Sequence, residues 1–536
     1  MSAVEEPVAL TPLPVDPDSM KMLKRGAVGL GAVCFMALAG SAPITAMTGN
    51  VPIAVGFGNG IYTPGAFIVA LVILTIFTVG YAAMSRHITA TGSFYGYISH
   101  GLGQTMGMAS GLLASVAYIV FEGSLIGIFS SFARTTIHNF GGPYIPWIWI
   151  AIFGIAVIAV MGYFDIEISG RVLGVFLVTE VAILLLLGFA VLFKGGGPAG
   201  LVPQALNPIK ALTTAAPSAP GISPSVGIGL FFAFWSWVGF ETVAVYGEES
   251  KNPKRIVPRG LFIVVISVGV LYVFISWMAI AGNGPAKAIA LARSSNPFSM
   301  FFNITQSFVG VWAKDIYEVL IITGSFACAL AFHNAASRYI YALGREAPNK
   351  SIRKVLGATH EKHKSPYAAS LIQSVITLGI ILAFFWLQKP SAAAPDVAYD
   401  YVYGLLAILG TMIILILQSL TSFSVISYFH VRKEHPETAN VFRTFLAPLI
   451  GALGMIYVVY LLFKNLDFAA GAAASSPFFK AIPWIVLAVA LIGIGYSLIL
   501  WKTQPEVYRQ MGRTVLVEAH ERDSDAELET DAVNPI

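Results

Sequence analysis

Four ionisable side chains stand inside long apolar stretches of this sequence, where a membrane or a protein core would surround them. They are Glu122, Glu180, Glu241 and His333. A charged side chain at the centre of a bilayer costs at least ~2.5 kcal/mol, so an ionisable residue at that depth is by default a functional candidate. The chemistry open to these groups is proton uptake and release, or the binding of a charged ligand.

Each of the four also has a structural interpretation. Glu241 directly follows an interruption of its helix, where it can cap exposed amides instead of serving in gating or proton transfer. Glu122 can be a protonated partner of a neighbouring helix, and Glu180 can be a packing partner. His333, next to Asn334 near the end of its segment, is better explained as a packing residue.

Two apolar segments are interrupted in mid-membrane. The first contains Gly40-Ser41-Ala42-Pro43, and the sixth runs from Trp235 through Ser236 and Val238 to Gly239. Unwound backbone leaves N–H and C=O groups unsatisfied in lipid, so it survives only where protein or a wet cavity meets it. Either break alone also fits a harmless kink. Together, at the first position of two five-helix blocks, they predict an inverted-repeat secondary transporter with its site at the breaks.

The composition supports a membrane protein. Of the 536 residues, 56% are apolar and 11% are Asp, Glu, Lys or Arg, against roughly 25% charged in an ordinary globular protein. So few charges cannot cover a soluble surface of this size, which disfavours nucleic-acid binding, secretion and a cytosolic enzyme. The two cysteines, Cys34 and Cys328, lie in apolar stretches and suggest buried thiols.

Twelve segments are long and apolar enough to span a membrane. They lie at about 27–53, 64–84, 105–131, 145–163, 168–193, 225–246, 260–282, 314–341, 366–387, 402–428, 443–464 and 482–501. The predicted divisions are an N-terminal tail at 1–25, a first five-helix repeat at 26–193, an extracytoplasmic loop at 194–224, a second repeat at 225–430, helices 11 and 12 at 431–502, and a C-terminal tail at 503–536.

The basic residues predict the orientation. With both termini cytoplasmic, 23 of the 32 Lys and Arg residues lie in inner segments and 9 in outer ones. Lys and Arg accumulate in cytoplasmic loops, so this asymmetry favours that arrangement in the plasma membrane.

The sequence resembles the amino acid, polyamine and organocation (APC) family of transporters over about residues 25 to 465. The stretches that carry the resemblance are Phe231–Glu241, Glu248–Arg259, Gly92–Tyr97, the glycine ladder Gly103, Gly107 and Gly111, and His333–Arg345. The resemblance implies an all-α polytopic fold of twelve helices. Ten of them would form a core of two inverted five-helix repeats like that of the leucine transporter, with helices 1 and 6 broken.

The resemblance also implies where an amino acid would bind. Its carboxylate would meet amides of the helix 1 break, and its ammonium would meet carbonyls of both breaks. The residues so indicated are Gly40, Ser41, Ala42, Ile44, Ser236, Val238 and Gly239. The family's usual Gly-Ser/Thr-Gly run is replaced here, and Pro43 donates no N–H, which weakens carboxylate recognition. The amides of Ile44 and Thr45 would remain available at the start of the outer half-helix.

Further roles follow from the same resemblance. Glu122, flanked by Tyr118, falls where the family's arginine and agmatine antiporter places a polar residue against the distal end of its substrate. Trp235 matches an aromatic residue that stacks over that substrate, and an indole would favour a cation. Glu180 aligns with a lysine that replaces a sodium ion in proton-coupled members. Basic amino acids or polyamines are therefore favoured over acidic ones.

The predicted function is a permease for amino acids or related amines that works by alternating access. Proton coupling is preferred, with Glu180 first and Glu241 second as the coupling residue, and sodium is the alternative. A polyamine exchanger is a second interpretation. A channel and a membrane-embedded enzyme are more distant, since neither a polar pore stripe nor a catalytic set is evident. No cofactor, metal site or nucleic-acid partner is expected, only a small solute, protons and membrane lipids.

The topology has a direct test. Single cysteines placed in the loops at 194–224 and 282–313 should react with an impermeant maleimide added from outside, because these loops are predicted to be extracytoplasmic. Cysteines at 348–362 should react only after the membrane is permeabilised. The reverse labelling pattern would refute the orientation.

Overall fold

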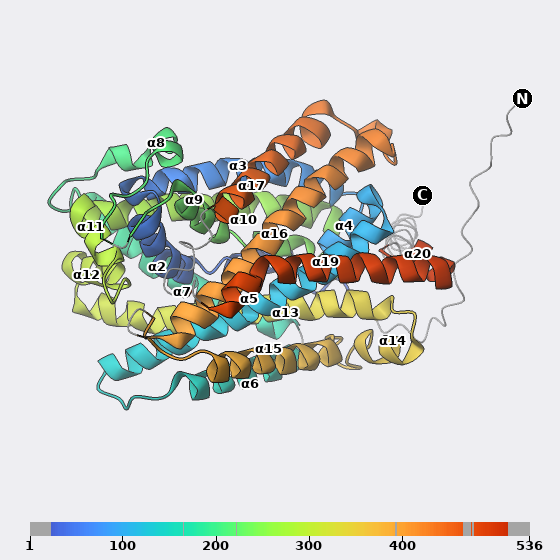
Figure 1. Ribbon diagram of the computed structural model, residues 1–536, viewed down its shortest axis with the longest axis horizontal. Helices are drawn as coiled ribbons and strands as arrows, with labels where there is room; N and C mark the ends of the chain where they lie inside the picture. The colour runs from blue at the N-terminus through green and yellow to red at the C-terminus, as the bar shows by residue number, and fades with distance from the viewer. Residues whose placement is uncertain are drawn as a thin grey trace, which may run out of the picture.

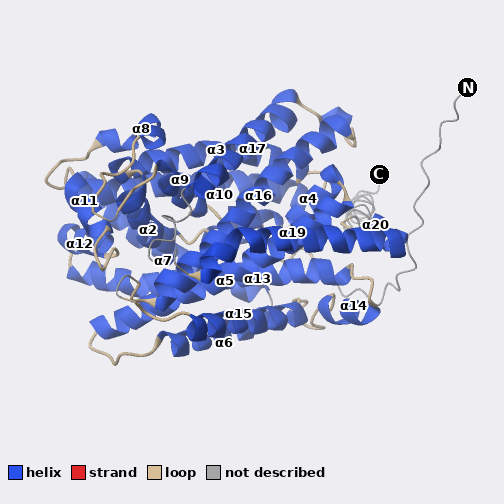
Figure 2. Cartoon of the chain, in the orientation of Figure 1, coloured by secondary structure: helices blue, strands red, loops and turns tan. Residues whose placement is uncertain are grey.

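The computed structural model describes residues 23–164, 166–220, 222–391, 394–464, 473 and 476–512; the side chains of 166–169 are not described. The described chain is helical, and Figure 2 shows its helices joined by loops without a strand. Both predicted tails fall mostly outside these residues.

Eleven helical stretches among the described residues are long and apolar enough to cross a membrane. The bounds of the helices that form them are α1 (Leu30–Gly40), α2 (Pro43–Ile53), α3 (Thr63–Met84), α5 (Gln104–Asn139), α7 (Ile166–Phe193), α9 (Val226–Trp235), α10 (Pro253–Asn283), α13 (Val311–Arg345), α15 (Tyr367–Leu387), α16 (Gly404–Ile426), α17 (Ala447–Lys464) and α19 (Pro477–Thr503).

The remaining predicted span is α6 (Trp147–Tyr163), which is apolar but only 17 residues long. Each of the twelve predicted segments is thus helical. Among the described residues, eleven of them are long enough to count as membrane spans. Short helices in the connections are α4 (Ser93–Leu102), α8 (Pro208–Thr213), α11 (Pro285–Ala292), α12 (Ser299–Phe308), α14 (Lys350–Leu356) and α20 (Pro505–Gln510).

The two longest helices, α5 and α13, form the centre of the bundle. They run side by side across the middle of Figure 1, with α6 and α15 packed together on one side and α3, α10 and α17 on the other. Large apolar side chains stay exposed on the outer helices, among them Trp149, Phe193, Leu387 and Trp484. Such an apolar exterior is stable only against lipid, which agrees with a multi-pass membrane protein.

The first break separates α1 from α2. Ala42 adopts a left-handed conformation with φ 45°, and Pro43 follows it at the first position of α2, where its missing N–H costs nothing. A non-glycine residue rarely adopts this left-handed conformation, because it costs energy. The conformation persists only where the surrounding structure enforces it.

The second break separates α9 from the short helix Phe240–Ala244. Gly239 lies between them with φ 115°, a conformation that only glycine adopts without strain. The two breaks touch, because a methyl group added to Gly239 would lie 2.6 Å from the carbonyl carbon of Gly40. The two interruptions therefore pack backbone against backbone.

This packing predicts a large cost for a single methyl group at the second break. Gly239→Ala should lower stability by about 2–4 kcal/mol, through the left-handed backbone and the overlap with Gly40. The measurement is the unfolding temperature of the purified protein in detergent. Gly379→Ala on α15, where an added methyl group meets nothing within 4 Å, is the matched control and should leave that temperature unchanged. Equal unfolding temperatures for the two variants would contradict the packing of the breaks.

Candidate functional site

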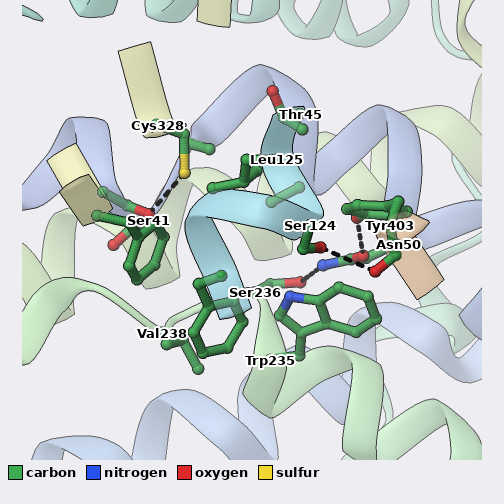
Figure 3. Close-up of a pocket in the computed structure, with 15 residues that line it drawn as sticks. Ser41, Thr45, Asn50, Ser124, Leu125, Trp235, Ser236, Val238, Cys328 and Tyr403 are labelled. Atoms are coloured by element: carbon green, nitrogen blue, oxygen red, sulfur yellow. Dashed lines mark hydrogen bonds between the residues drawn. The ribbon is translucent and has the colours of Figure 1, made fainter. Parts of the chain in front are cut away.

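A small cavity of about 30 Å³ lies where the two breaks meet. This is room for roughly two water molecules, so the cavity is closed around less space than an amino acid needs. Figure 3 shows it enclosed by side chains from α1, α2, α5, α9, α13, the two breaks and the helical segment Val397–Tyr403 that precedes α16. The residues that line it are Gly40, Ser41, Ala42, Thr45, Ala46, Asn50, Phe121, Ser124, Leu125, Trp235, Ser236, Val238, Cys328, Phe332 and Tyr403.

The carbonyl groups freed by the first break have partners inside the protein. The Cys328 thiol donates to the carbonyl oxygen of Gly40 at 3.1 Å, and the Tyr272 hydroxyl donates to the carbonyl oxygen of Ser41. Each carbonyl keeps a second lone pair, so both can still accept a hydrogen bond from a ligand.

The amide of Ile44 does not face the cavity, although the resemblance implied that it would bind a substrate carboxylate. The carboxyl group of Glu180 on α7 lies beside this amide, and Ile44 is not among the lining residues. Glu180 is 2% exposed. A carboxylate from the protein itself therefore occupies the anion-favouring start of α2.

A similar arrangement occurs at the second break, where the short helix Phe240–Ala244 begins. The amide of Gly239 donates to one carboxyl oxygen of Glu241 at 3.1 Å, and the Tyr118 hydroxyl donates to the other at 3.0 Å. Glu241 thus caps the break, as its structural interpretation expected. Tyr118 and Gly239 are held by these contacts and do not line the cavity.

A hydrogen-bonded chain that the sequence did not predict crosses one wall of the cavity. The Asn50 amide donates to Ser236 Oγ at 3.0 Å and accepts from the Tyr403 hydroxyl at 2.8 Å. Ser124 donates to the Tyr403 carbonyl at 2.8 Å. Figure 3 shows Asn50 between Ser236 and Tyr403. Asn50 is seven residues, about two turns, after Pro43, so a polar side chain on the broken helix was the available signal.

The aromatic floor of the cavity is formed by Trp235. Its ring lies 5.2 Å from that of Tyr403 and 4.9 Å from that of Phe232, measured between centroids. Phe121 and Phe332 stack with centroids 4.9 Å apart on another side. Aromatic rings therefore form two sides of the cavity.

Glu122 does not line the cavity. Its carboxylate accepts from Gln373 Nε2 at 2.5 Å and lies 3.1 Å from His333 Nδ1. His333 Nε2 is 2.8 Å from the Ser370 hydroxyl. Both Glu122 and His333 are fully buried. The carboxylate therefore joins α5 to α13 and α15, which is the structural alternative for this residue.

The cavity is electrically neutral. None of the residues that line it is Asp, Glu, His, Lys or Arg. Its polar groups are hydroxyls, one amide, the Cys328 thiol, the Trp235 indole and backbone, and its apolar groups include Leu125 and Val238. The Thr45 hydroxyl is buried and has no hydrogen-bond partner among the described residues, which leaves it available for a ligand.

Two buried ion pairs join the loop after the short helix Phe240–Ala244 to α13. Arg338 holds Glu249 through two hydrogen bonds of 2.6 and 2.9 Å, and Arg345 holds Glu248 at 2.7 and 3.1 Å. Burial alone would raise the pKa of Glu248, but the Arg345 guanidinium and the Thr91 amide outweigh it and lower that pKa to about 2. At the opposite end Arg134 pairs with Asp396 at 2.6 Å.

Comparison with known proteins decides the family. The model of the amino acid permease family matches residues 30–491. The chain belongs to the amino acid permease family. Proteins of this family are membrane transporters, so this permease is a transport protein and not an enzyme, and the resemblance found in the sequence is confirmed.

The relatives of this permease are distant. It is 22% identical to the branched-chain amino acid permease BcaP of Bacillus subtilis, over 82% of this chain and 88% of that one. It is 23% identical to the low-affinity putrescine importer PlaP of Escherichia coli, over 82% and 89%. A solved structure of a sodium-coupled sialic acid symporter is 12% identical, with a TM-score of 0.49, over 84% and 90%.

Proposed function

We propose that this permease is a secondary active transporter of small neutral amino acids with aliphatic side chains. The observation that carries the proposal is the neutral cavity at the two helix breaks, with apolar side chains beside hydroxyl and amide groups. A ligand with a net charge would lose its hydration there without gaining a partner of opposite charge. The branched-chain amino acid permeases among the relatives support the same class.

A cationic substrate is the second candidate. Trp235 offers the aromatic face that favours a cation, and one relative is named a putrescine importer. The preference for basic substrates rested on Glu122, whose carboxylate is engaged by Gln373 and His333 instead. Basic selectivity stays a prediction that no acidic side chain of the cavity supports.

The mechanism that we propose is alternating access in the plasma membrane, with both termini cytoplasmic. The blocks 26–193 and 225–430 would be the two inverted repeats, with the breaks as their corresponding points. In this mechanism the aromatic contacts of Trp235 would close one side of the cavity, and the capped second break with the Glu248–Arg345 ion pair would close the other. Opening either side would expose the same neutral site.

Proton coupling is proposed for Glu180. Its carboxyl group is buried at the start of α2, and one of its oxygens has no hydrogen-bond partner among the described residues. A buried ionised carboxylate is costly without a cation. Loss and gain of a proton by Glu180 would therefore change how strongly this side chain interacts with the start of α2. Thr323 and Ser325 hydroxyls, the sodium alternative, donate to carbonyls of their own helix.

The substrate is tested by competition in proteoliposomes loaded with unlabelled leucine. Uptake of labelled leucine should be saturable and inhibited by excess valine, isoleucine or alanine, and unaffected by glutamate, lysine or putrescine. Thr45→Val should raise the KM about 2- to 10-fold, the loss of one hydrogen bond. Thr78→Val, a buried threonine on α3 away from the cavity, is the control. Inhibition by lysine or putrescine alone would replace the proposal with the cationic candidate.

The coupling is tested with a pH gradient. Wild-type protein should accumulate substrate when the outside is acidic, with or without sodium. Glu180→Gln should abolish accumulation but keep exchange between internal and external substrate, because the site stays intact while proton binding is lost. Glu318→Gln, at an acid paired with Lys314 at 2.7 Å, should behave like wild type. Accumulation that needs sodium and ignores a protonophore would refute Glu180 as the carrier.

A further inference from the structure

A second and larger cavity lies far from the helix breaks along the chain, at one end of the bundle. Its volume is about 440 Å³. It is bounded by the end of α3, the first third of α10 and the segment that leads into α17, and α3 packs against both of the other two elements (Figure 1). Its walls include Arg86, His87, Phe262, Phe442 and Arg443. Neither the transport site nor its coupling uses this cavity.

The position of the two arginines places them at the membrane boundary. Arg86 comes two residues after the end of α3 at Met84. Arg443 comes two residues after the start of the apolar stretch Val441–Lys464. Residues that flank an apolar span lie at the depth of the lipid headgroups. Both guanidinium groups are therefore at the level where phosphate groups occur.

The charge of this cavity is unbalanced. Within the described residues neither guanidinium makes a hydrogen bond or an ion pair, and both arginines are exposed. The acid nearest along the chain to this rim, Glu437, is held by His435 at 2.8 Å. The rim therefore attracts an anion.

His87 adds hydrogen bonding rather than charge at neutral pH. Burial and the neighbouring His435 lower its pKa to about 4. Its ring stacks on His435 with centroids 4.2 Å apart, and its Nε2 lies 3.1 Å from the Thr438 hydroxyl. The positive charge of the rim at pH 7 thus comes from the permanently charged arginines.

Apart from Thr438 and Thr444, the remaining walls are apolar and continue toward the lipid-facing surface. Phe262, Phe429 and Val79 contribute to the cavity, and Phe442 is 59% exposed beside it. Phosphate-binding sites for soluble metabolites do not need such walls. An acyl chain does, because it leaves the headgroup directly into an apolar environment.

We propose that this cavity binds the headgroup of an anionic phospholipid, with Arg86 and Arg443 on its phosphate and an acyl chain along Phe262 and Phe442. Guanidinium groups match phosphate oxygens in a fork geometry. Basic pockets between membrane helices are a recurrent way of holding such headgroups. The site would fasten a lipid between α3, α10 and the start of α17.

The test is lipid binding to the purified, delipidated permease by native mass spectrometry, with thermal unfolding as a second readout. Phosphatidylglycerol should bind and raise the unfolding temperature, whereas phosphatidylcholine and soluble glycerol phosphate should not. Arg86→Gln combined with Arg443→Gln should weaken phosphatidylglycerol binding about 10- to 30-fold, the effect of two basic residues near an anionic headgroup.

The control removes the same charge elsewhere at this end of the bundle. Lys350→Gln combined with Lys354→Gln, both exposed on α14, should keep wild-type binding. The arginine pair is exposed, so the double variant should unfold like wild type without lipid, which separates lost binding from misfolding. Equal binding of phosphatidylcholine, equal binding of glycerol phosphate, or unchanged binding by the arginine variant would each overturn the proposal.

Discussion

The structure depends on how it satisfies backbone that two membrane helices leave unpaired. Lipid offers no hydrogen bonds, so each interrupted helix must find its partners inside the protein. Gly40 and Gly239 bring the two interruptions into contact, and Cys328 and Tyr272 donate to carbonyls of the first. The central position of α5 and α13, which screen this region from lipid, follows from the same requirement.

The two breaks use carboxylates in the same way. The Glu180 carboxyl group lies beside the Ile44 amide at the start of α2, and Glu241 accepts from the amide of Gly239 at the second break. Negative charge at a helix start is favourable. Glu180 and Glu241 are thus engaged at the protein's own helix ends, Glu122 is engaged by His333 and Gln373, and the cavity between the breaks has no charged side chain in its lining. This is the reason for favouring neutral substrates.

The stretches that carried the family resemblance are joined in space. Glu248 and Glu249 follow helix 6, and Arg345 and Arg338 end α13; the four form two buried, doubly hydrogen-bonded ion pairs. Removing one partner of a buried pair leaves an uncompensated charge, at a cost of about 3–5 kcal/mol. The pairs join the loop that contains Glu248 and Glu249 to α13. These family stretches therefore form a structural contact and not a ligand site.

The sequence by itself determined the membrane class, the helical segments, both breaks and the family, because hydropathy and unpaired backbone act locally along the chain. It also pointed to Gly40, Ser41, Ala42, Trp235, Ser236 and Val238, which line the cavity. Which face of α5 meets the cavity was decided by tertiary packing. A helix turns about 100° per residue, so a small rotation brings Phe121, Ser124 and Leu125 to the cavity and turns Glu122 toward His333 and Gln373. The partners of Glu122 lie more than two hundred residues away, and only the folded bundle brings them together.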